Sequence, residues 1–246
     1  MEFVDKVVLI TGGRRIGSAV AETLARHGAH ISLSYRRSAD DANRSAAAVR
    51  SHGRRALVTQ ADLTDPRACR QLIADTSREL GQLNALINMA SSYVLSPFDE
   101  LTEDDLDDAL EVDVRGAYLC ALAAVPHLRA AGGGHIINFS DWVAHSGRPR
   151  YPGFLPYYVA KKAVIGLTEA LALELAEDRI LVNAIAPGAV RPPEEMTAAE
   201  VERVAEATPL GRWGGDDEIA RAVVALLGSD FTTGETIRVD GGRHLR

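Results

Sequence analysis

Cysteine, excess basic charge and long apolar runs are all scarce in this sequence of 246 residues. The two cysteines, Cys69 and Cys120, lie far apart in apolar helical patterns, which favours reduced, packed thiols over a disulfide. A formal net charge of -7 argues against nucleic acid or an anionic membrane as the main partner, because both require a basic face. No apolar run is long enough for a signal peptide or a membrane span, so we expect a cytoplasmic protein.

Metal-binding patterns are also scarce. The histidines, cysteines and acidic residues nowhere show the spacing of a metal-ligand set, so the sequence predicts no metal.

Short runs rich in Val, Ile and Leu alternate with longer helical patterns along the whole chain. The expected strands are Lys6–Thr11, His30–Tyr35, Arg55–Gln60, Ala85–Asn88, His135–Ser140, Ile180–Ala186 and Thr236–Asp240. The expected helices are Ile16–His27, Asp40–His52, Asp65–Leu80, Thr102–Arg129, Tyr157–Ala176 and Asp216–Leu227. This alternation predicts a Rossmann-type, doubly wound α/β fold: one domain over residues 1–246, with a seven-stranded parallel sheet and helices on both faces.

One segment stands outside the alternation. Residues 191–209 open with Pro192-Pro193 and continue into a charged helix. We expect this segment to form a lid over a site.

The first strand-to-helix turn reads Thr11-Gly12-Gly13-Arg14-Arg15-Ile16-Gly17. In an open parallel sheet this turn usually holds phosphates, because its glycines allow close approach and the helix N-terminus offers free N–H groups. The spacing is not G-x-G-x-x-G, and a glycine-rich turn without a ligand is the alternative.

The end of the second strand reads Tyr35-Arg36-Arg37-Ser38. An NAD site would carry an acidic residue here for the ribose 2′-hydroxyl, whereas a 2′-phosphate requires cations. Two arginines with no carboxylate before Asp40 favour NADPH. A solvated basic turn is the alternative.

Two tyrosine–lysine pairs share the helical pattern that begins at Tyr157. Tyr157 and Lys161 are four residues apart, as are Tyr158 and Lys162, so each pair would share one helix face. A phenol beside an ammonium group is a plausible acid catalyst, because the positive charge lowers the phenol pKa. An ordinary solvated pair has the same spacing.

With these motifs in order, the chain resembles the short-chain dehydrogenase/reductase family over its whole length. The matching segments are the TGGRRIG turn, Ala61-Asp62-Leu63, Asn88-Met89-Ala90-Ser91, Tyr-x-x-x-Lys, Pro187-Gly188 and Val239-Asp240-Gly241-Gly242. In the family, the catalytic lysine stands five residues before the glycine of a V-I-G-[LF]-T run. Val164 to Thr168 is that run here, so the resemblance selects Tyr157 as the acid and Lys161 as its partner.

The chain departs from the family pattern at three positions. Asp141 stands where the family has its catalytic serine, with Ser140 as the competing candidate, while Arg15 and Ser91 replace usual glycines. These changes resemble the pteridine reductases and the short-chain dihydromonapterin and dihydrofolate reductases. In the family's N-x-x-G motif the asparagine is Asp113 here, and its charge could pair with Arg115.

The resemblance implies roles for specific residues. The catalytic residues would be Asp141, Tyr157 and Lys161, and the pterin substrate would lie against Arg15, Ser91, Tyr93, Asp141 and Tyr157. The cofactor NADPH would contact Gly12, Arg14, Arg15, Ile16, Tyr35, Arg36, Arg37, Ser38, Asp62, Leu63, Asn88, Ala90, Ser91, Tyr157, Lys161, Pro187 and Gly188.

Three functions follow as hypotheses. The first is an NADPH-dependent reductase that transfers a hydride to a C=O or C=N group of a pterin-like small molecule. The second is a 3-oxoacyl-thioester or simple ketone reductase of the same family. The third is a catalytically silent NADP-binding regulator. The resemblance also implies a homotetramer.

Overall fold

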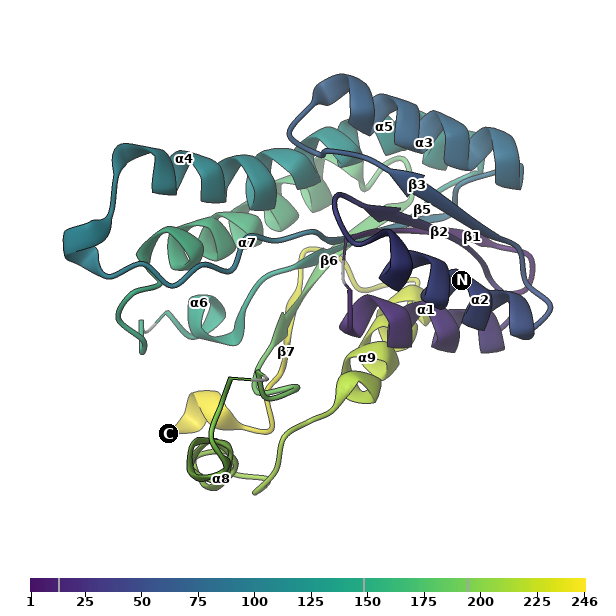
Figure 1. Ribbon diagram of the computed structural model, residues 1–246. Coiled ribbons are helices and arrows are strands. Elements are labelled where there is room, and N and C mark those ends of the chain that lie inside the picture. Colours follow the sequence, from purple (N-terminus) through teal and green to yellow (C-terminus); the bar gives the residue numbers. More distant parts are fainter. Residues whose placement is uncertain (13, 148, 194) are drawn as a thin grey trace.

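The computed structural model describes residues 1–12, 14–147, 149–193 and 195–246 (Figure 1). Gly13 of the predicted phosphate turn and Glu194 of the predicted lid lie outside the described residues. Within the described part of the chain, no helix is long and apolar enough to cross a membrane.

The seven predicted strands form one sheet in the order β3-β2-β1-β4-β5-β6-β7, and every neighbouring pair is parallel. The strands are β1 Val7–Gly12, β2 His30–Tyr35, β3 Ala56–Gln60, β4 Ala85–Met89, β5 Gly134–Phe139, β6 Ile180–Pro187 and β7 Thr236–Val239. The predicted fold class is confirmed. Strand order reverses between β1 and β4, where doubly wound sheets open a crevice for ligands.

Helices cover both faces of the sheet (Figure 1). The α-helices are α1 Ile16–Arg26, α2 Ala39–Ser51, α3 Pro66–Leu80, α4 Glu103–Leu110, α5 Gly116–Ala130, α6 Trp142–Ser146, α7 Leu155–Leu175, α8 Ala198–Glu206 and α9 Asp216–Gly228. One apolar core joins the sheet to α1, α2 and α9, and a second joins it to α3, α5 and α7. Cys69 and Cys120 are buried in the second core as free thiols.

One predicted helix is interrupted. The expected continuous helix Thr102–Arg129 consists of α4, a π-helical turn Glu111–Arg115 (η2) and α5. A π-helical turn inserts an extra residue into the helix and changes which side chains face inward. Here it buries Asp113, which is only 3% exposed.

Two further helices complete the fold, and of these only α8 agrees with an expected helix. The short helix α6 follows β5 directly and was not expected, and the predicted lid contains α8, whose Thr197–Glu200 capping box fixes its start. Both elements lie on the side of the molecule where the strands end (Figure 1).

Candidate active site

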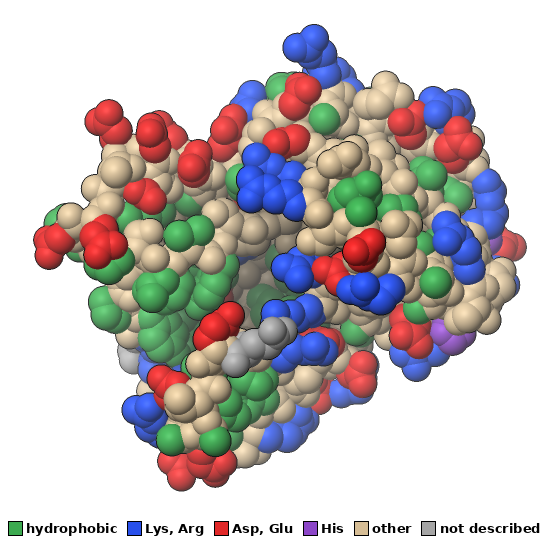
Figure 2. Space-filling model, viewed as in Figure 1, with side chains coloured by type: hydrophobic (Ala, Val, Ile, Leu, Met, Phe, Trp, Pro, Cys, Tyr) green, Lys and Arg blue, Asp and Glu red, His purple; other side chains and the backbone are tan. Residues whose placement is uncertain are grey.

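The carboxyl ends of β1 to β4 surround a cavity at the reversal of strand order. Its lining combines residues from these strand ends with one from η2: Gly12, Ser34, Tyr35, Arg36, Ala61, Asp62, Leu63, Thr64, Ala90 and Val112. Figure 2 shows the face hollowed at its centre, with hydrophobic side chains on its left edge and Lys and Arg side chains on its right. Six of the predicted cofactor residues therefore line one cavity.

Gly12 is required at the floor of this cavity. Its φ is +66°, and a Cβ there would lie 2.7 Å from the Ala90 Cα. A side chain would therefore be strained by both backbone conformation and contact. The bare backbone next to the start of α1 fits a pyrophosphate, as the predicted dinucleotide site requires.

The predicted basic residues lie at the first turn and at the end of β2, and two of them form ion pairs with acids of neighbouring segments. Arg36 Nε lies 3.0 Å from Asp62 Oδ2, so it spans the ends of β2 and β3 at the cavity. Arg14 pairs with Asp41 of α2 at 2.8 Å. Arg15 and Arg37 are exposed at the turn and at the end of β2.

The remaining predicted cofactor residues lie outside the cavity lining. Ile16 begins α1, Ser38 precedes α2, and Pro187 and Gly188 lie at the end of β6. Asn88 has a structural role, because its Nδ2 donates a hydrogen bond to Asn138 Oδ1 at 2.9 Å and thereby links β4 to β5.

Tyr157 meets Asp141 across the site. The Tyr157 hydroxyl donates to Asp141 Oδ2 at 3.1 Å. Asp141 is the N-cap of α6, and its Oδ1 accepts a hydrogen bond from the Val143 backbone N–H at 2.7 Å. The cap fixes the carboxylate and leaves its second oxygen for the phenol.

Lys161 lies one helical turn beyond Tyr157 and is buried, whereas Lys162 is exposed. Its Nζ donates to the Phe139 carbonyl oxygen at 2.8 Å and lies 2.7 Å from Asp113 Oδ1. The same Nζ is 5.6 Å from the centroid of the Tyr157 ring. Burial and contacts thus support the register that selects Tyr157 and Lys161.

Asp113 pairs with Lys161 and not with Arg115, so that alternative is wrong. Arg115 lies on the outer side of η2, where it pairs with Glu111 at 3.0 Å. Asp113 also accepts hydrogen bonds from the Ser91 hydroxyl at 2.6 Å and from the Ser92 N–H at 2.8 Å. Ser91 is therefore held by Asp113 at the end of β4.

Ser140 is excluded from the family serine's position by its contacts. Its hydroxyl donates to the Lys161 carbonyl oxygen at 2.8 Å and is buried in the fold. Asp141 occupies the place beside Tyr157, as the register predicts.

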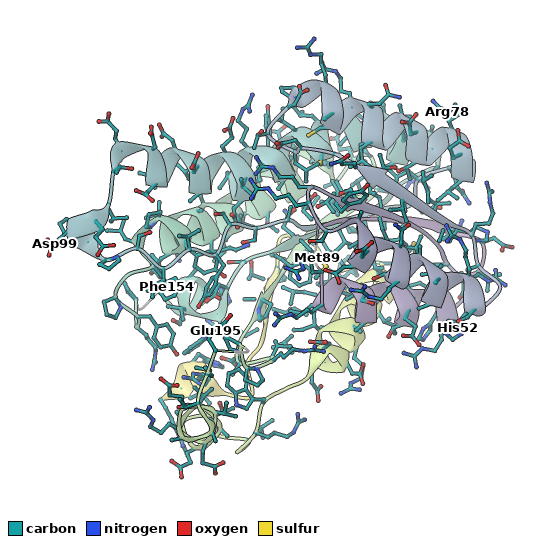
Figure 3. The ribbon with its side chains drawn as sticks, viewed as in Figure 1. His52, Arg78, Met89, Asp99, Phe154 and Glu195 are labelled. Carbon is teal, nitrogen blue, oxygen red and sulfur yellow. The ribbon has the colours of Figure 1, made fainter. Side chains whose placement is uncertain are left out.

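Aromatic rings form one wall of the site. Tyr93 stacks on Phe154 with ring centroids 4.7 Å apart and meets Tyr157 edge-on at 4.9 Å. Tyr93 is still 64% exposed. In Figure 3, Phe154 lies on the α7 side of the hollow, Met89 on the sheet and Glu195 in the segment that leads to α8.

Burial and nearby carboxylates shape the proton chemistry. Burial, followed by the charges of Asp141 and Asp113, raises the pKa of Tyr157 well above its usual value. Burial also raises the pKa of Asp141, although hydrogen bonds from Val143 and Tyr157 oppose the shift. In this arrangement Tyr157 is a neutral phenol, a proton donor and not a phenolate.

Two participants were missing from the predicted site list. Asp113 contacts Lys161 directly, and its N-x-x-G-like spacing was the available signal. Phe154 forms the stack with Tyr93, but an aromatic residue before a helix carries no sequence signal of such a role.

The predicted lid contains α8, which is hydrogen-bonded to the indole of Trp213. Trp213 Nε1 donates to the Val201 carbonyl oxygen of α8 at 3.0 Å, so Trp213 tethers α8. No residue of α8 is buried among those described, which leaves the helix loosely packed.

Among the described residues, no group of three or more His, Cys, Asp or Glu side chains could hold a metal ion.

Comparison with known proteins defines the family. Residues 12–244 match the family model described as enoyl-(acyl carrier protein) reductase. The chain is 37% identical to the uncharacterized oxidoreductase YohF of Escherichia coli over 96% of this chain and 95% of that protein. It is 33% identical to the 3-oxoacyl-[acyl-carrier-protein] reductase FabG of Staphylococcus aureus, over 98% and 99% respectively.

A solved structure agrees. The crystal structure of acetoin dehydrogenase from Enterobacter cloacae superposes with a TM-score of 0.88 at 35% identity, covering 98% of this chain and 96% of that one. Sequence, fold and the arrangement of Tyr157 and Lys161 agree, and the chain belongs to the short-chain dehydrogenase/reductase family of oxidoreductases.

Proposed function

We propose that this protein is an NADPH-dependent reductase that converts a ketone carbonyl of a small molecule, a simple ketone or a 3-oxoacyl thioester, to an alcohol. The observation that carries the proposal is the Tyr157 hydroxyl, which hydrogen-bonds to Asp141 at the open end of the sheet, one helical turn from the buried Lys161. The relatives named for a 3-oxoacyl thioester and for acetoin support this substrate class over a pterin.

The chain's own groups deliver and replace the proton. A nicotinamide bound in the cavity would supply the hydride. Tyr157, kept neutral by burial, donates its proton to the carbonyl oxygen once that oxygen replaces Asp141 as its acceptor. Burial raises the pKa of Asp141, so this carboxylate takes up a proton from solvent more readily than an exposed aspartate and is the group through which Tyr157 would regain its proton. Lys161 is fixed by Phe139 and Asp113.

The proposed cofactor preference is NADPH over NADH. Arg36 and Arg37 are exposed at the end of β2, and Arg36 and Tyr35 border the cavity. Asp41 of α2 does not offer a free ribose partner, because it is paired with Arg14 and Arg44. We expect Arg36→Ala to raise the KM for NADPH about tenfold or more and to leave the KM for NADH almost unchanged.

Oxidation of the reduced cofactor tests the reaction. The wild-type protein should oxidise NADPH with an acetoacetyl thioester or with diacetyl. Tyr157→Phe removes the donor and should lower kcat by about 10²- to 10⁴-fold. The matched control is Tyr158→Phe, which removes a phenol from the neighbouring position. Equal activity of Tyr157→Phe and Tyr158→Phe would refute the proposal.

A pterin substrate is the second candidate. The exposed, stacked Tyr93 offers a flat aromatic face, and Asp141 offers a carboxylate to a polar heterocycle edge. Turnover of dihydrobiopterin or dihydromonapterin that depends on Tyr93 would favour it. Ketone turnover that is unchanged in Tyr93→Ala would favour the carbonyl substrate.

A catalytically silent regulator is distinguished by the same assay. It would bind NADPH tightly and oxidise it with none of these substrates.

A homotetramer remains part of the proposal, supported by exposed apolar residues on α5 and α7: Tyr118, Leu122, Val159 and Leu173. Sedimentation of the purified protein measures its oligomeric state directly.

A further inference from the structure

A second pocket lies beside the candidate active site. It has a volume of about 460 Å³, within the range of small-molecule sites. It is an open pocket bordered by α6, the loop before α7, the end of α8 and the 3-10 turn Arg243–Leu245 (η3), which gather on one side of the molecule (Figure 1). Its lining residues are Trp142, Arg150, Tyr151, Ala207, Arg243 and Arg246.

Three guanidinium groups converge here in a protein whose formal net charge is -7. Arg150, Arg243 and Arg246 make no ion pair with any carboxylate among the described residues. Arg150 Nε is buried and has no hydrogen-bond partner in the part of the chain that the structure describes. Uncompensated like charges in one pocket repel each other, and a buried donor without an acceptor is unfavourable, so the pocket favours an anion.

The cations are held in place before any ligand arrives. The guanidinium carbons of Arg150 and Arg243 each lie 5.4 Å from the centroid of the Trp142 ring, which is only 5% exposed. Arg243 also donates to the Val204 carbonyl oxygen at 3.1 Å and to the Tyr151 hydroxyl at 2.8 Å. The buried indole offsets part of the repulsion through cation–π contacts, and the site needs little reorganisation to bind.

The last arginine joins the pocket to the predicted lid. Arg246 Nη1 donates to the Glu206 carbonyl oxygen at 3.0 Å, at the last residue of α8. The pocket is thus lined by four separate segments, two of which supply its three arginines. A planar, bidentate anion such as a carboxylate, or a phosphate, matches the guanidinium fork.

The pocket is also connected to the reacting groups. Trp142 directly follows Asp141, whose carboxylate meets Tyr157. Tyr151 lies in the loop that leads to Phe154, and its phenol contributes to raising the pKa of Tyr93 after burial and Asp141. A single ligand could therefore extend from the arginine pocket to the mouth of the active site.

We propose that the pocket formed by Arg150, Arg243 and Arg246 around Trp142 binds a carboxylate or phosphate group, and that this group belongs to the carbonyl substrate. The second part rests on the proposed reductase function. The first part does not, because an anion pocket can bind without turnover.

Direct binding tests the pocket. Calorimetry with inorganic phosphate and with acetate, at constant ionic strength, should show saturable binding to the full-length protein. Arg150→Gln should weaken it at least about tenfold, because it removes a guanidinium whose buried Nε has no hydrogen-bond partner among the described residues. Arg150→Lys should restore part of the affinity. Arg70→Gln, at an exposed position on α3, is the matched loss of one positive charge and should bind like the wild type.

Matched substrates test where the anion comes from. Acetoacetate and ethyl acetoacetate carry the same ketone with and without a carboxylate. Arg150→Gln should raise the KM for acetoacetate at least about tenfold and change the KM for the ester less than about twofold. Phosphate should compete with acetoacetate only. Equal effects on both substrates would overturn the assignment to a substrate group.

The two proposals fail in different ways. If no carbonyl compound is reduced but phosphate binding depends on Arg150, the reductase function is wrong and the anion pocket stands. If ketones are reduced through Tyr157 but no anion binds in an Arg150-dependent manner, the pocket is wrong and the reductase stands.

Discussion

The Lys161 ammonium and the Asp113 carboxylate form an ion pair at 2.7 Å in which the side chains are 4% and 0% exposed. Burial makes each charge depend on the other, because neither can be solvated by water. Asp113 also accepts from Ser91 and Ser92, so the pair joins α7, η2 and the end of β4. The lysine at the site is therefore positioned by a carboxylate from a different helix.

Removing Asp113 should destabilise the protein. Asp113→Ala leaves a buried ammonium without its counter-charge, and we expect the free energy of unfolding to fall by about 3 to 5 kcal/mol. Urea unfolding at pH 7 measures this loss in the free energy of unfolding. Ser91→Ala removes one hydrogen bond to the same carboxylate and should lower the free energy by about 1 kcal/mol. Similar losses in both variants would contradict a dominant role for the ion pair.

The charge of Asp141 should be visible in the pH dependence of the reaction. This charge raises the pKa of Tyr157, so Asp141→Asn should lower that pKa. The phenol then loses its proton at a lower pH, and the alkaline limb of the kcat profile should move towards lower pH. Asp99→Asn, at an exposed acid in the 3-10 turn Phe98–Glu100 (η1), is the control and should leave the profile in place. If the alkaline limb of the kcat profile does not move in Asp141→Asn, Asp141 takes no part in proton delivery.

The predictable parts of this molecule are those set by local pattern. Near-continuous apolar runs place all seven strands, with ends that shift by a residue, because buried parallel strands need apolar side chains on both faces. The register of Val164 to Thr168 selects Lys161 over Lys162, and burial agrees with that selection.

The parts that could not be predicted depend on contacts between distant residues. Asp113 turns inward only because a π-helical turn interrupts α4 and α5, and helical periodicity cannot show where such a turn forms. The pairing of Arg14 with Asp41 likewise depends on how α2 packs beside the first turn. α6 is only five residues long, too short for a periodic signal.

His135 should make the protein less stable in mild acid. It is 6% exposed on β5, and burial lowers its pKa from 6.5 to about 4. Because the folded pKa is below the unfolded value, its contribution is fully present above pH 6.5 and is lost as pH falls towards 4. The loss at pH 4 is roughly 3 kcal/mol.

The difference between two proteins isolates this contribution. Unfolding free energies at pH 7 and pH 4.5 should fall further in the wild type than in His135→Gln, which cannot titrate there. Asp141, whose pKa is raised, acts in the opposite direction in both proteins and cancels in the comparison. Parallel pH profiles for the two proteins would exclude His135 as the source.

Two glycines should respond to alanine in opposite ways. A Cβ at Gly188 would lie 2.5 Å from both the Cα and the Cβ of Asp240, so the end of β6 must move away from the turn after β7. Such overpacking typically lowers the free energy of unfolding by about 1 to 3 kcal/mol. At Gly166, inside α7, no described atom beyond the adjoining helix backbone and the two chain neighbours lies within 4 Å of the added Cβ. Gly166→Ala should therefore raise the free energy of unfolding by about 0.5 to 1 kcal/mol through helix propensity. Urea unfolding of both variants measures the two effects. A Gly188→Ala protein as stable as the wild type would show that the close approach of β6 to Asp240 is not a constraint on the fold.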